Sequence, residues 1–384
     1  MHVAYLTTYY NGRVDGRFGR FHDWVHTLRE MEDPPFEFDV VALTASNPDE
    51  TLSSRPHGFL GDATDLWGSA ANNVEFLLNV PRALRDLRAL DPDVVHVLTL
   101  DLIAYPIAVA LSGRSPVVGP DVQGYFPGRS GDRWNQGGLA GIKNLLRYRL
   151  RGRLIDLSTD PRLVALSRYH ADNVRKLGVN GRVEVIPPGV SSIFRPDTAG
   201  EATGDGDPTE FLYLGDLSQY KGYELFVDAL AALPDSVDFR ATVVGSGDPD
   251  RSRLGELGLA DRIDVAGFVD RADIPEYYRR ADAYVMPSID ENGPNTIVES
   301  LACGTPVVAT DRPGINEYVP EEAAVYVDRT RAGLRRGMER IHRHRATYAA
   351  AARDLASEYR AVHTVDALAD LYEAHLKGIE SREN

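Results

Sequence analysis

The chain has 384 residues, with 42 Lys and Arg against 57 Asp and Glu, and its formal net charge is −15. The length predicts two or three domains with ample cores, and 43% hydrophobic residues exclude a mostly disordered chain. No apolar run approaches the ~20 residues of a membrane span. The excess of acidic residues argues against general nucleic-acid binding, which needs a basic surface.

The cations are nearly all arginine, because lysine occurs only at Lys143, Lys176, Lys221 and Lys377. We expect such an acidic, lysine-poor surface of a halophilic protein, which works where salt screens charge. The single cysteine, Cys303, excludes an internal disulfide framework. The start, MHVAYLTTYY, has no basic region followed by an apolar stretch, so we expect no secretory signal and a cytoplasmic protein.

Short β-rich runs alternate with helical stretches in the first half of the chain. Strands are predicted at 2–8, 38–44, 74–79, 94–100, 115–119, 163–167 and 183–187. Helices are predicted at 18–31, 82–90, 101–112, 138–154 and 169–178. This alternation indicates βαβ units around a parallel sheet.

The alternation stops in a polar, glycine-rich stretch at 197–210 and then restarts. Strands are predicted at 210–214, 240–245, 263–266, 283–286, 306–309 and 323–327. Helices are predicted at 221–232, 250–258, 273–280, 295–303, 331–342, 345–360 and about 364–378. We therefore expect an α/β protein of two doubly wound domains facing across a cleft, with ligands beyond the carboxyl ends of the strands.

Lys221 opens the helix that follows the first strand of the second half, after Gly215 and Asp216. A helix dipole disfavours a cation at this end, whereas a bound phosphate would bring the ammonium and the helix amides together. Lys221 thus predicts a phosphate site, against the alternative of a solvated surface lysine. Gly245 and Gly247 after the next strand are a weaker signal, since a plain turn has the same glycines.

The most informative stretch is 287–306, PSIDENGPNTIVESLACGTP, in which a loop leads into a helix near Asn295 or Thr296. Glu291 lies in the loop and Glu299 in the first helical turns, and each carboxylate can accept two hydrogen bonds from a vicinal diol. Sugars and ribose both offer such diols, so one diphosphate-linked ligand would occupy both glutamates. The alternative is a capping Asn295, a Glu299 favoured by the helix dipole and a solvated Glu291.

Together these motifs resemble the retaining glycosyltransferases of family 4, also called glycosyl transferases group 1. The resemblance rests on E-x7-E before ACGTPVVAT, on the segment from Gly215 to Gly222, and on VGSG at 244–247. It extends to PDVVH at 92–96, VALS and VIPPGV, and so covers most of the chain. It implies the GT-B fold of two Rossmann-like domains: acceptor-binding over 1–190 and nucleotide-sugar-binding over 210–362.

The resemblance also implies a linker over 191–209 and a last helix, about 363–384, that returns to the N-terminal domain. By position, Glu299 would bind the ribose diol, Glu291 the donor hexose near the reacting carbon, and Lys221 the diphosphate. The other implied donor-binding residues are Gly16, Gly19, Gly215, Asp216, Gly245, Gly247, Phe268, Gly293, Pro294, Asn295 and Thr296.

Two positions depart from the family. Asp216 stands where the family has an arginine that gives the diphosphate a second cation, and arginines of the N-terminal loop such as Arg20 would compensate. The family's histidine beside the transferring sugar is missing from 118–124. Asp121 is the polar substitute there, and His22 is another candidate for the cleft.

The implied reaction moves a hexose-type sugar from a UDP- or GDP-sugar to a glycan or lipid-linked acceptor, without a cofactor or metal. This would belong to polysaccharide or glycolipid biosynthesis or to protein glycosylation. One alternative is a degenerate sugar-nucleotide- or glycan-binding partner subunit, which Asp216 and the missing histidine favour and the intact Lys221, Glu291 and Glu299 oppose. The other is a nucleotide-sugar epimerase, which would need acid–base residues in the cleft.

Three further signals are weaker. His22 and His26 have the spacing of a zinc helix, but Asp23 replaces its glutamate and no third ligand is evident. The segment 141–154 carries five cations and no acid among leucines, and it predicts either peripheral contact with the inner membrane face or pairing with acids elsewhere. Cys303 is expected to be a packed small residue at a helix end.

Overall fold

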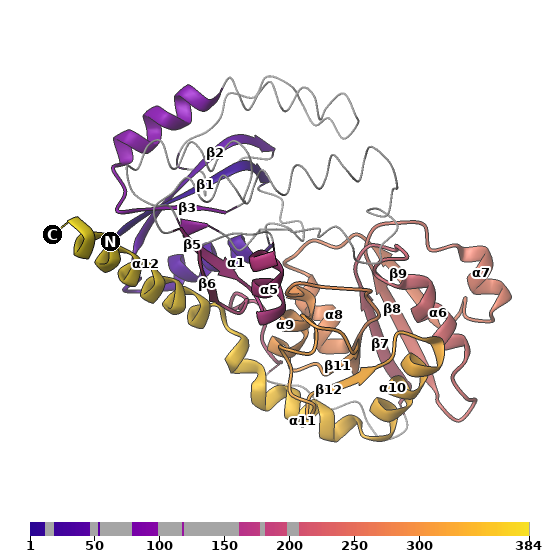
Figure 1. Cartoon of the computed structure of the whole chain (residues 1–384). Helices are drawn as coiled ribbons and strands as arrows, with labels where there is room; N and C mark the ends of the chain where they lie inside the picture. The colour runs from indigo at the N-terminus through magenta and orange to yellow at the C-terminus, as the bar shows by residue number, and fades with distance from the viewer. Residues whose placement is uncertain are drawn as a thin grey trace. The chain divides into compact units, whose positions relative to one another are not determined.

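The computed structural model describes residues 1–11, 19–46, 53, 79–98, 117–118, 161–176, 181–197 and 207–383. The chain divides into two compact units, and each is described by itself. Unit 1 comprises Met1–Pro187 with Thr364–Asn384, and unit 2 comprises Pro188–His363. Each contains a six-stranded sheet in which every described pair of neighbouring strands is parallel (Figure 1).

The sheet of unit 1 has the strand order β2-β1-β3-β4-β5-β6. Its strands are β1 (His2–Asn11), β2 (Glu37–Ser46), β3 (Val94–Val97), β4 (Val117–Val118), β5 (Arg162–Ala165) and β6 (Arg182–Val185). The described helices that lie between these strands in the sequence are α1 (Gly19–Glu30), residues 79–90, and α5 (Arg168–Lys176). Residues 3–6 of β1 are fully buried, as expected of a strand covered on both faces.

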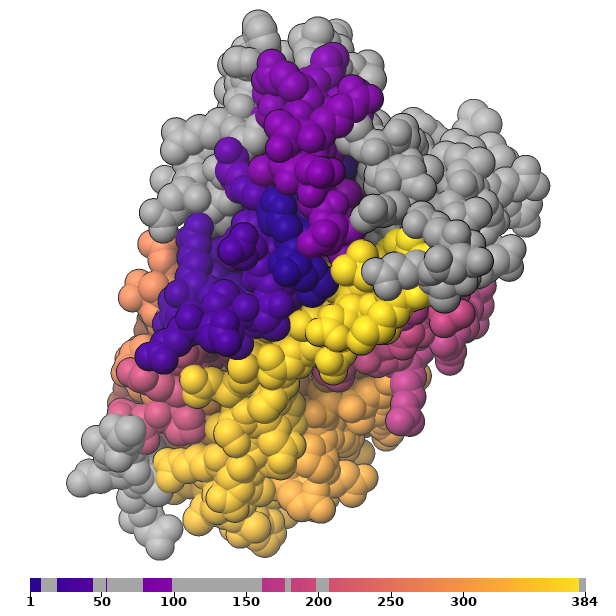
Figure 2. Space-filling view, turned by 90° about the vertical axis from the view of Figure 1, so that its left-hand side faces the viewer, coloured from indigo at the N-terminus to yellow at the C-terminus, as the bar shows by residue number. Residues whose placement is uncertain are grey.

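Helix α12 (Ala361–Glu383) completes the core of unit 1 with residues from the end of the chain. The hydroxyl of the fully buried Tyr372 lies 3.3 Å from that of Tyr5 and 2.5 Å from Nδ1 of His96. Arg162 of β5 donates to the carbonyl of Ala374 at 3.0 Å. Figure 2 shows this helix in yellow against the indigo residues of the first strands and helix.

The sheet of unit 2 has the strand order β12-β11-β10-β7-β8-β9. Its strands are β7 (Thr209–Leu214), β8 (Phe239–Val244), β9 (Ile263–Gly267), β10 (Ala283–Met286), β11 (Val307–Thr310) and β12 (Ala324–Val327). Its helices are α6 (Tyr223–Ala231), α7 (Arg251–Glu256), α8 (Ile274–Arg280), α9 (Asn295–Ala302), α10 (Arg331–Arg343), α11 (Arg345–Leu355) and the 3-10 helix η1 (Ala356–Tyr359).

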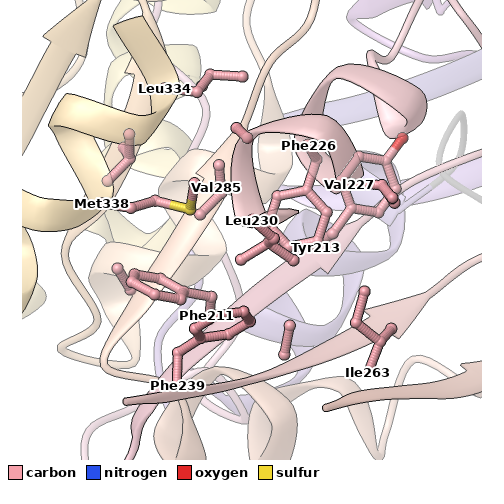
Figure 3. Packing of buried hydrophobic residues seen from close by; sticks show 14 of the residues in the cluster. Phe211, Tyr213, Phe226, Val227, Leu230, Phe239, Ile263, Val285, Leu334 and Met338 are labelled. Carbon is pink, nitrogen blue, oxygen red and sulfur yellow. The ribbon is translucent and has the colours of Figure 1, made fainter. Parts of the chain in front are cut away.

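Successive side chains of the strands in unit 2 enter different cores, because side chains alternate between the faces of a sheet. Phe211 and Tyr213 of β7 join a cluster with Phe226 and Leu230 of α6 and Met338 of α10, as Figure 3 shows. Leu212 of the same strand joins the second cluster, to which α9 contributes its buried apolar residues. With both faces covered, the carboxyl ends of the strands are left to carry a site.

The described elements lie within three residues of the predicted ranges, with three exceptions. Asn79 lies in a helix instead of ending a strand. The helix predicted at 345–360 ends at Leu355 and continues as η1. The last helix extends to residue 383.

The predicted segments 101–112 and 138–154 fall outside the described residues. Across the part of the chain that the structure describes, no helix combines the length and apolar content needed to cross a bilayer.

We predict that Tyr372→Phe lowers the free energy of unfolding by about 1–3 kcal/mol, because it removes a buried hydroxyl shared by Tyr5 and His96. Urea unfolding measured by circular dichroism checks this. Tyr277→Phe is the matched control, since no hydrogen bond of its hydroxyl is found among the described residues. Equal stability of the two variants would contradict the role of the Tyr372 hydroxyl.

Candidate functional site

Three strand ends of unit 2 are tied together at one edge of its sheet. The amide of Gly215, directly after β7, donates to the carbonyl of Val244 at 2.9 Å. The amide of Gly245, directly after β8, donates to the carbonyl of Gly267 at 2.8 Å. The loops that carry the predicted site residues therefore leave the sheet side by side.

Two glycines are required for this close approach. Gly222 has a φ of 81°, and a Cβ there would lie 2.4 Å from the carbonyl oxygen of Pro287. Gly245 has a φ of 149°, and its Cβ would lie 1.9 Å from the carbonyl oxygen of Gly215. Because any side chain would push these backbones apart, the glycines fix the distance between neighbouring loops.

Lys221 and Glu291 lie in loops that follow the neighbouring strands β7 and β10: residues 215–222, here called the Lys221 loop, and residues 287–294, here called the Glu291 loop. The amide of Ile289 donates to the carbonyl of Tyr220 at 3.0 Å, and the Tyr220 hydroxyl donates to the carbonyl of Asp290 at 2.7 Å. The Lys221 ammonium lies 2.6 Å from Oε1 of Glu291. The structure thus brings together two predicted site residues that are 70 positions apart.

Glu299 is held inside unit 2 by two donors. Arg271 donates to its Oε1 at 2.7 Å and the Tyr278 hydroxyl donates to its Oε2 at 3.1 Å. The Glu299 side chain is only 4% exposed, so its charge needs the guanidinium beside it. The Arg271 guanidinium also lies over the Phe194 ring, 4.7 Å from its centre. Burial, with Glu299 beside it, raises the pKa of Tyr278 well above its ordinary value.

The start of α9 lies in the same region of unit 2. The helix begins at Asn295, and its capping position is Pro294, which makes no side-chain cap. The alternative of a capping Asn295 is therefore wrong, because this residue lies one position inside the helix. The hydroxyl of Tyr284 donates to Oγ1 of Thr296 at 2.9 Å and so links the first turn to β10.

Several predicted donor-binding residues surround these loops. Asp216 is exposed, and its carbonyl accepts a hydrogen bond from the Tyr213 hydroxyl at 2.7 Å. Phe268, directly after β9, is 68% exposed, a high value for a phenylalanine. Gly247 has a φ of 138° and lies against Leu217, and Gly293 is buried.

The predicted residues of the N-terminal half belong to unit 1. Gly19, Arg20 and His22 lie on α1 of unit 1, with Gly19 buried and the other two half-buried. Gly16, Asp121 and the basic segment 141–154 fall outside the described residues. Nothing in the described ranges groups three or more His, Cys, Asp or Glu side chains for a metal.

Sequence reasoning missed Arg271 and Tyr278. They lie 28 and 21 positions before Glu299 on the β9–α8 segment, and no spacing rule connects them to it. The available signal was the position of Glu299 among the apolar residues Ile297, Val298 and Leu301, since a carboxylate buried with them requires a partner.

Two family descriptions match most of the chain. Residues 24–192 match Glycosyltransferase Family 4 and residues 196–352 match Glycosyl transferases group 1. The D-inositol 3-phosphate glycosyltransferase of Paenarthrobacter aurescens is 30% identical over 208 residues, which are 48% of this chain and 51% of that protein. The sulfoquinovosyl transferase of Arabidopsis thaliana is 24% identical over 80% of this chain and 59% of its own length. The chain spans about half the length of the first of these relatives.

Solved structures similar to this chain cover nearly all of it. Sucrose-phosphate synthase from Thermosynechococcus elongatus has a TM-score of 0.74 at 17% identity, covering 98% of this chain and 99% of its own. HepE of Anabaena in complex with UDP and glucose has a TM-score of 0.70 at 19% identity, covering 97% and 100%. These likenesses show that the fold is GT-B, as the sequence predicts.

We predict that Cys303 in the folded protein resists thiol reagents. Its side chain is buried, and burial raises the pKa of the thiol to about 12, so the reactive thiolate is scarce at pH 8. Labelling with dithionitrobenzoate should be at least ~100-fold slower in buffer than in denaturant. Rapid stoichiometric labelling of the folded chain would show that Cys303 is accessible and activated.

Proposed function

Because this chain belongs to the glycosyltransferases of group 1 and family 4, we propose that it transfers a hexose-type sugar from a nucleotide diphosphate donor to a glycan or lipid-linked acceptor. The observation that supports this best is the 2.6 Å contact of Lys221 with Glu291 where the strands of unit 2 end. At this edge a cation for phosphate and a carboxylate for a sugar lie together, and Glu299 is held on the adjoining helix α9.

In the proposed reaction, Lys221 and the start of α9 stabilise the negative charge of the departing diphosphate. In the structure, the Lys221 ammonium donates to Oε1 of Glu291 at 2.6 Å. A diphosphate carries more negative charge than one carboxylate, so it competes with Glu291 for Lys221. The released carboxylate of Glu291 is then available to the hydroxyls of the hexose.

Glu299 is proposed to accept hydrogen bonds from the ribose diol. Each carboxylate oxygen has two lone pairs, and Arg271 and Tyr278 use one on each oxygen. The remaining pair of acceptor positions suits two neighbouring hydroxyls. The exposed ring of Phe268 is proposed to lie beside the base, where an aromatic face can stack.

The anomeric configuration is proposed to be retained. The bond between the anomeric carbon and the diphosphate oxygen breaks while the acceptor oxygen forms its bond on the same face of the sugar. The proton of the acceptor hydroxyl passes to an oxygen of the departing diphosphate. No protein nucleophile takes part, so catalysis consists of positioning and stabilisation of the leaving group.

The partners follow from the same proposal. HepE, which shares the fold, forms complexes named with UDP, with UDP and glucose, and with UDP-glucose, so UDP-sugars are the first donors to test beside GDP-sugars. We place the acceptor in unit 1 and the reaction in the cytoplasm, with peripheral membrane contact through 141–154.

The test is release of nucleoside diphosphate from a panel of UDP-, GDP-, ADP- and dTDP-sugars in high salt, with and without a lipid extract. We predict release from one donor and a loss of at least ~100-fold in Glu291→Gln, because this substitution removes the carboxylate near the reacting carbon. Glu276→Gln is the matched control, since Glu276 is an exposed glutamate of the same unit.

Two outcomes would contradict the proposal. If Glu291→Gln released nucleoside diphosphate as fast as the wild-type protein, Glu291 would have no role in the reaction. Absence of release from every donor by the folded protein would support the partner-subunit alternative.

We predict that Asp216→Arg strengthens nucleoside diphosphate binding about fivefold at low salt and less at high salt, because it replaces an exposed anion by a cation. Titration calorimetry at two salt concentrations checks this. Asp235→Arg makes the same charge change at an exposed position before β8, at the opposite end of the strands. An equal gain in both variants would show a general charge effect instead of a local one.

A further inference from the structure

Arg329 connects the two loops that carry Lys221 and Glu291. It lies between β12 and α10, and its Nε donates to the carbonyl of Pro287 at 2.9 Å. Its Nη2 donates to the carbonyl of Gln219 at 2.8 Å. Gln219 and Pro287 belong to the Lys221 loop and the Glu291 loop, so a single planar guanidinium spans both.

The charge of Arg329 has no carboxylate partner among the described residues, since both of its hydrogen bonds go to neutral carbonyls. Burial and the neighbouring Arg312 lower the pKa of this guanidinium. Arg329 thus brings a positive charge to the backbone of two loops in which Asp216, Asp290 and Glu291 outnumber Lys221. This charge matters because Asp216 stands where the family resemblance implies a cation for the diphosphate.

Arg329 also connects the loops in a way that the donor does not disturb. In the proposed reaction, the diphosphate takes Lys221 away from Glu291, which removes one tie between the loops. The contacts of Tyr220 and the bridge from Arg329 use backbone carbonyls and remain in place. The rigid fork of a guanidinium suits two carbonyls at fixed positions, whereas a lysine offers a single ammonium on a flexible stem.

We propose that Arg329 is a positioning residue for the donor: it holds the Lys221 loop against the Glu291 loop and supplies positive charge behind the diphosphate site. This inference rests on the proposed function. It predicts that Arg329 contributes to the affinity for nucleoside diphosphates and not to the affinity for nucleoside monophosphates.

The experiment compares nucleoside diphosphates with their monophosphates by titration calorimetry, using UDP and UMP, GDP and GMP, and ADP and AMP. For the pair that binds the wild-type protein, Arg329→Gln should lower the affinity for the diphosphate at least tenfold and change the affinity for the monophosphate less than twofold. The diphosphate affinity of Arg329→Lys should lie between those of the wild-type protein and Arg329→Gln. This variant keeps the positive charge but loses the two fixed donors of the guanidinium.

Arg345→Gln is the matched control. Arg345 donates to the carbonyl of Asp207 at 3.2 Å and contacts Asp282 at 3.4 Å, so it bridges two segments that precede β7 and β10, at the opposite ends of these strands. We expect this variant to keep the wild-type ratio of diphosphate to monophosphate affinity, even if its melting temperature falls.

Each result has a defined meaning. A selective loss of diphosphate affinity in Arg329→Gln supports the inference. Equal losses for both ligands, or no loss, in a folded variant overturns it while leaving the proposed function intact. If Arg329→Gln does not fold, the ratio of diphosphate to monophosphate affinity is measured for Arg329→Lys. A lower ratio than in the wild-type protein supports the inference, and an unchanged ratio overturns it. If the wild-type protein binds no nucleoside diphosphate, the proposed function fails and the inference fails with it.

Discussion

The contact between Gly222 and the carbonyl of Pro287 is the constraint on which the arrangement of the site depends. It brings the first turn of α6 against the end of β10, and only a residue without Cβ permits this distance. Lys221 immediately precedes this contact, and Glu291 follows it by four residues. The ion pair between them is therefore a consequence of how two backbones pack. Arg329 reinforces this packing from a third segment, so side-chain chemistry and backbone geometry support each other.

The two glutamates of the motif have different environments, and this difference suits different tasks. Glu291 is 15% exposed and pairs with a lysine that is 35% exposed, so its partner can be exchanged for a ligand. Glu299 is 4% exposed and is held by Arg271, itself 12% exposed, and by Tyr278. Exchanging a partner inside a core leaves a buried charge uncompensated, which is costly. Glu291 is accordingly suited to change partners during a reaction, whereas Glu299 is suited to remain fixed.

Local patterns predicted most elements of the fold. Periodicity and turn residues placed the strands and helices of unit 2 to within a few residues, because both depend on neighbours in the chain. The association of Lys221 with the Glu291 loop was also foreseeable, since parallel strands end at one edge of their sheet. The contacts of Arg271 and Arg329 were not, because they join residues 28, 42 and 110 positions apart. Such contacts are decided by how the helices pack on the sheet, which no local pattern records.

Helix α12 has a consequence for the order in which the two units fold during synthesis. Unit 1 contains strands that precede unit 2 in the chain, yet its core requires Tyr372 and its neighbours from α12, which follows unit 2. Until that helix is synthesised, Tyr5 and His96 lack a hydroxyl that they contact in the finished protein. Unit 2, whose residues are contiguous from Pro188 to His363, has no such dependence. The strands of unit 1 are therefore translated before unit 2 but gain their complete core only after it, so unit 2 can fold first during synthesis.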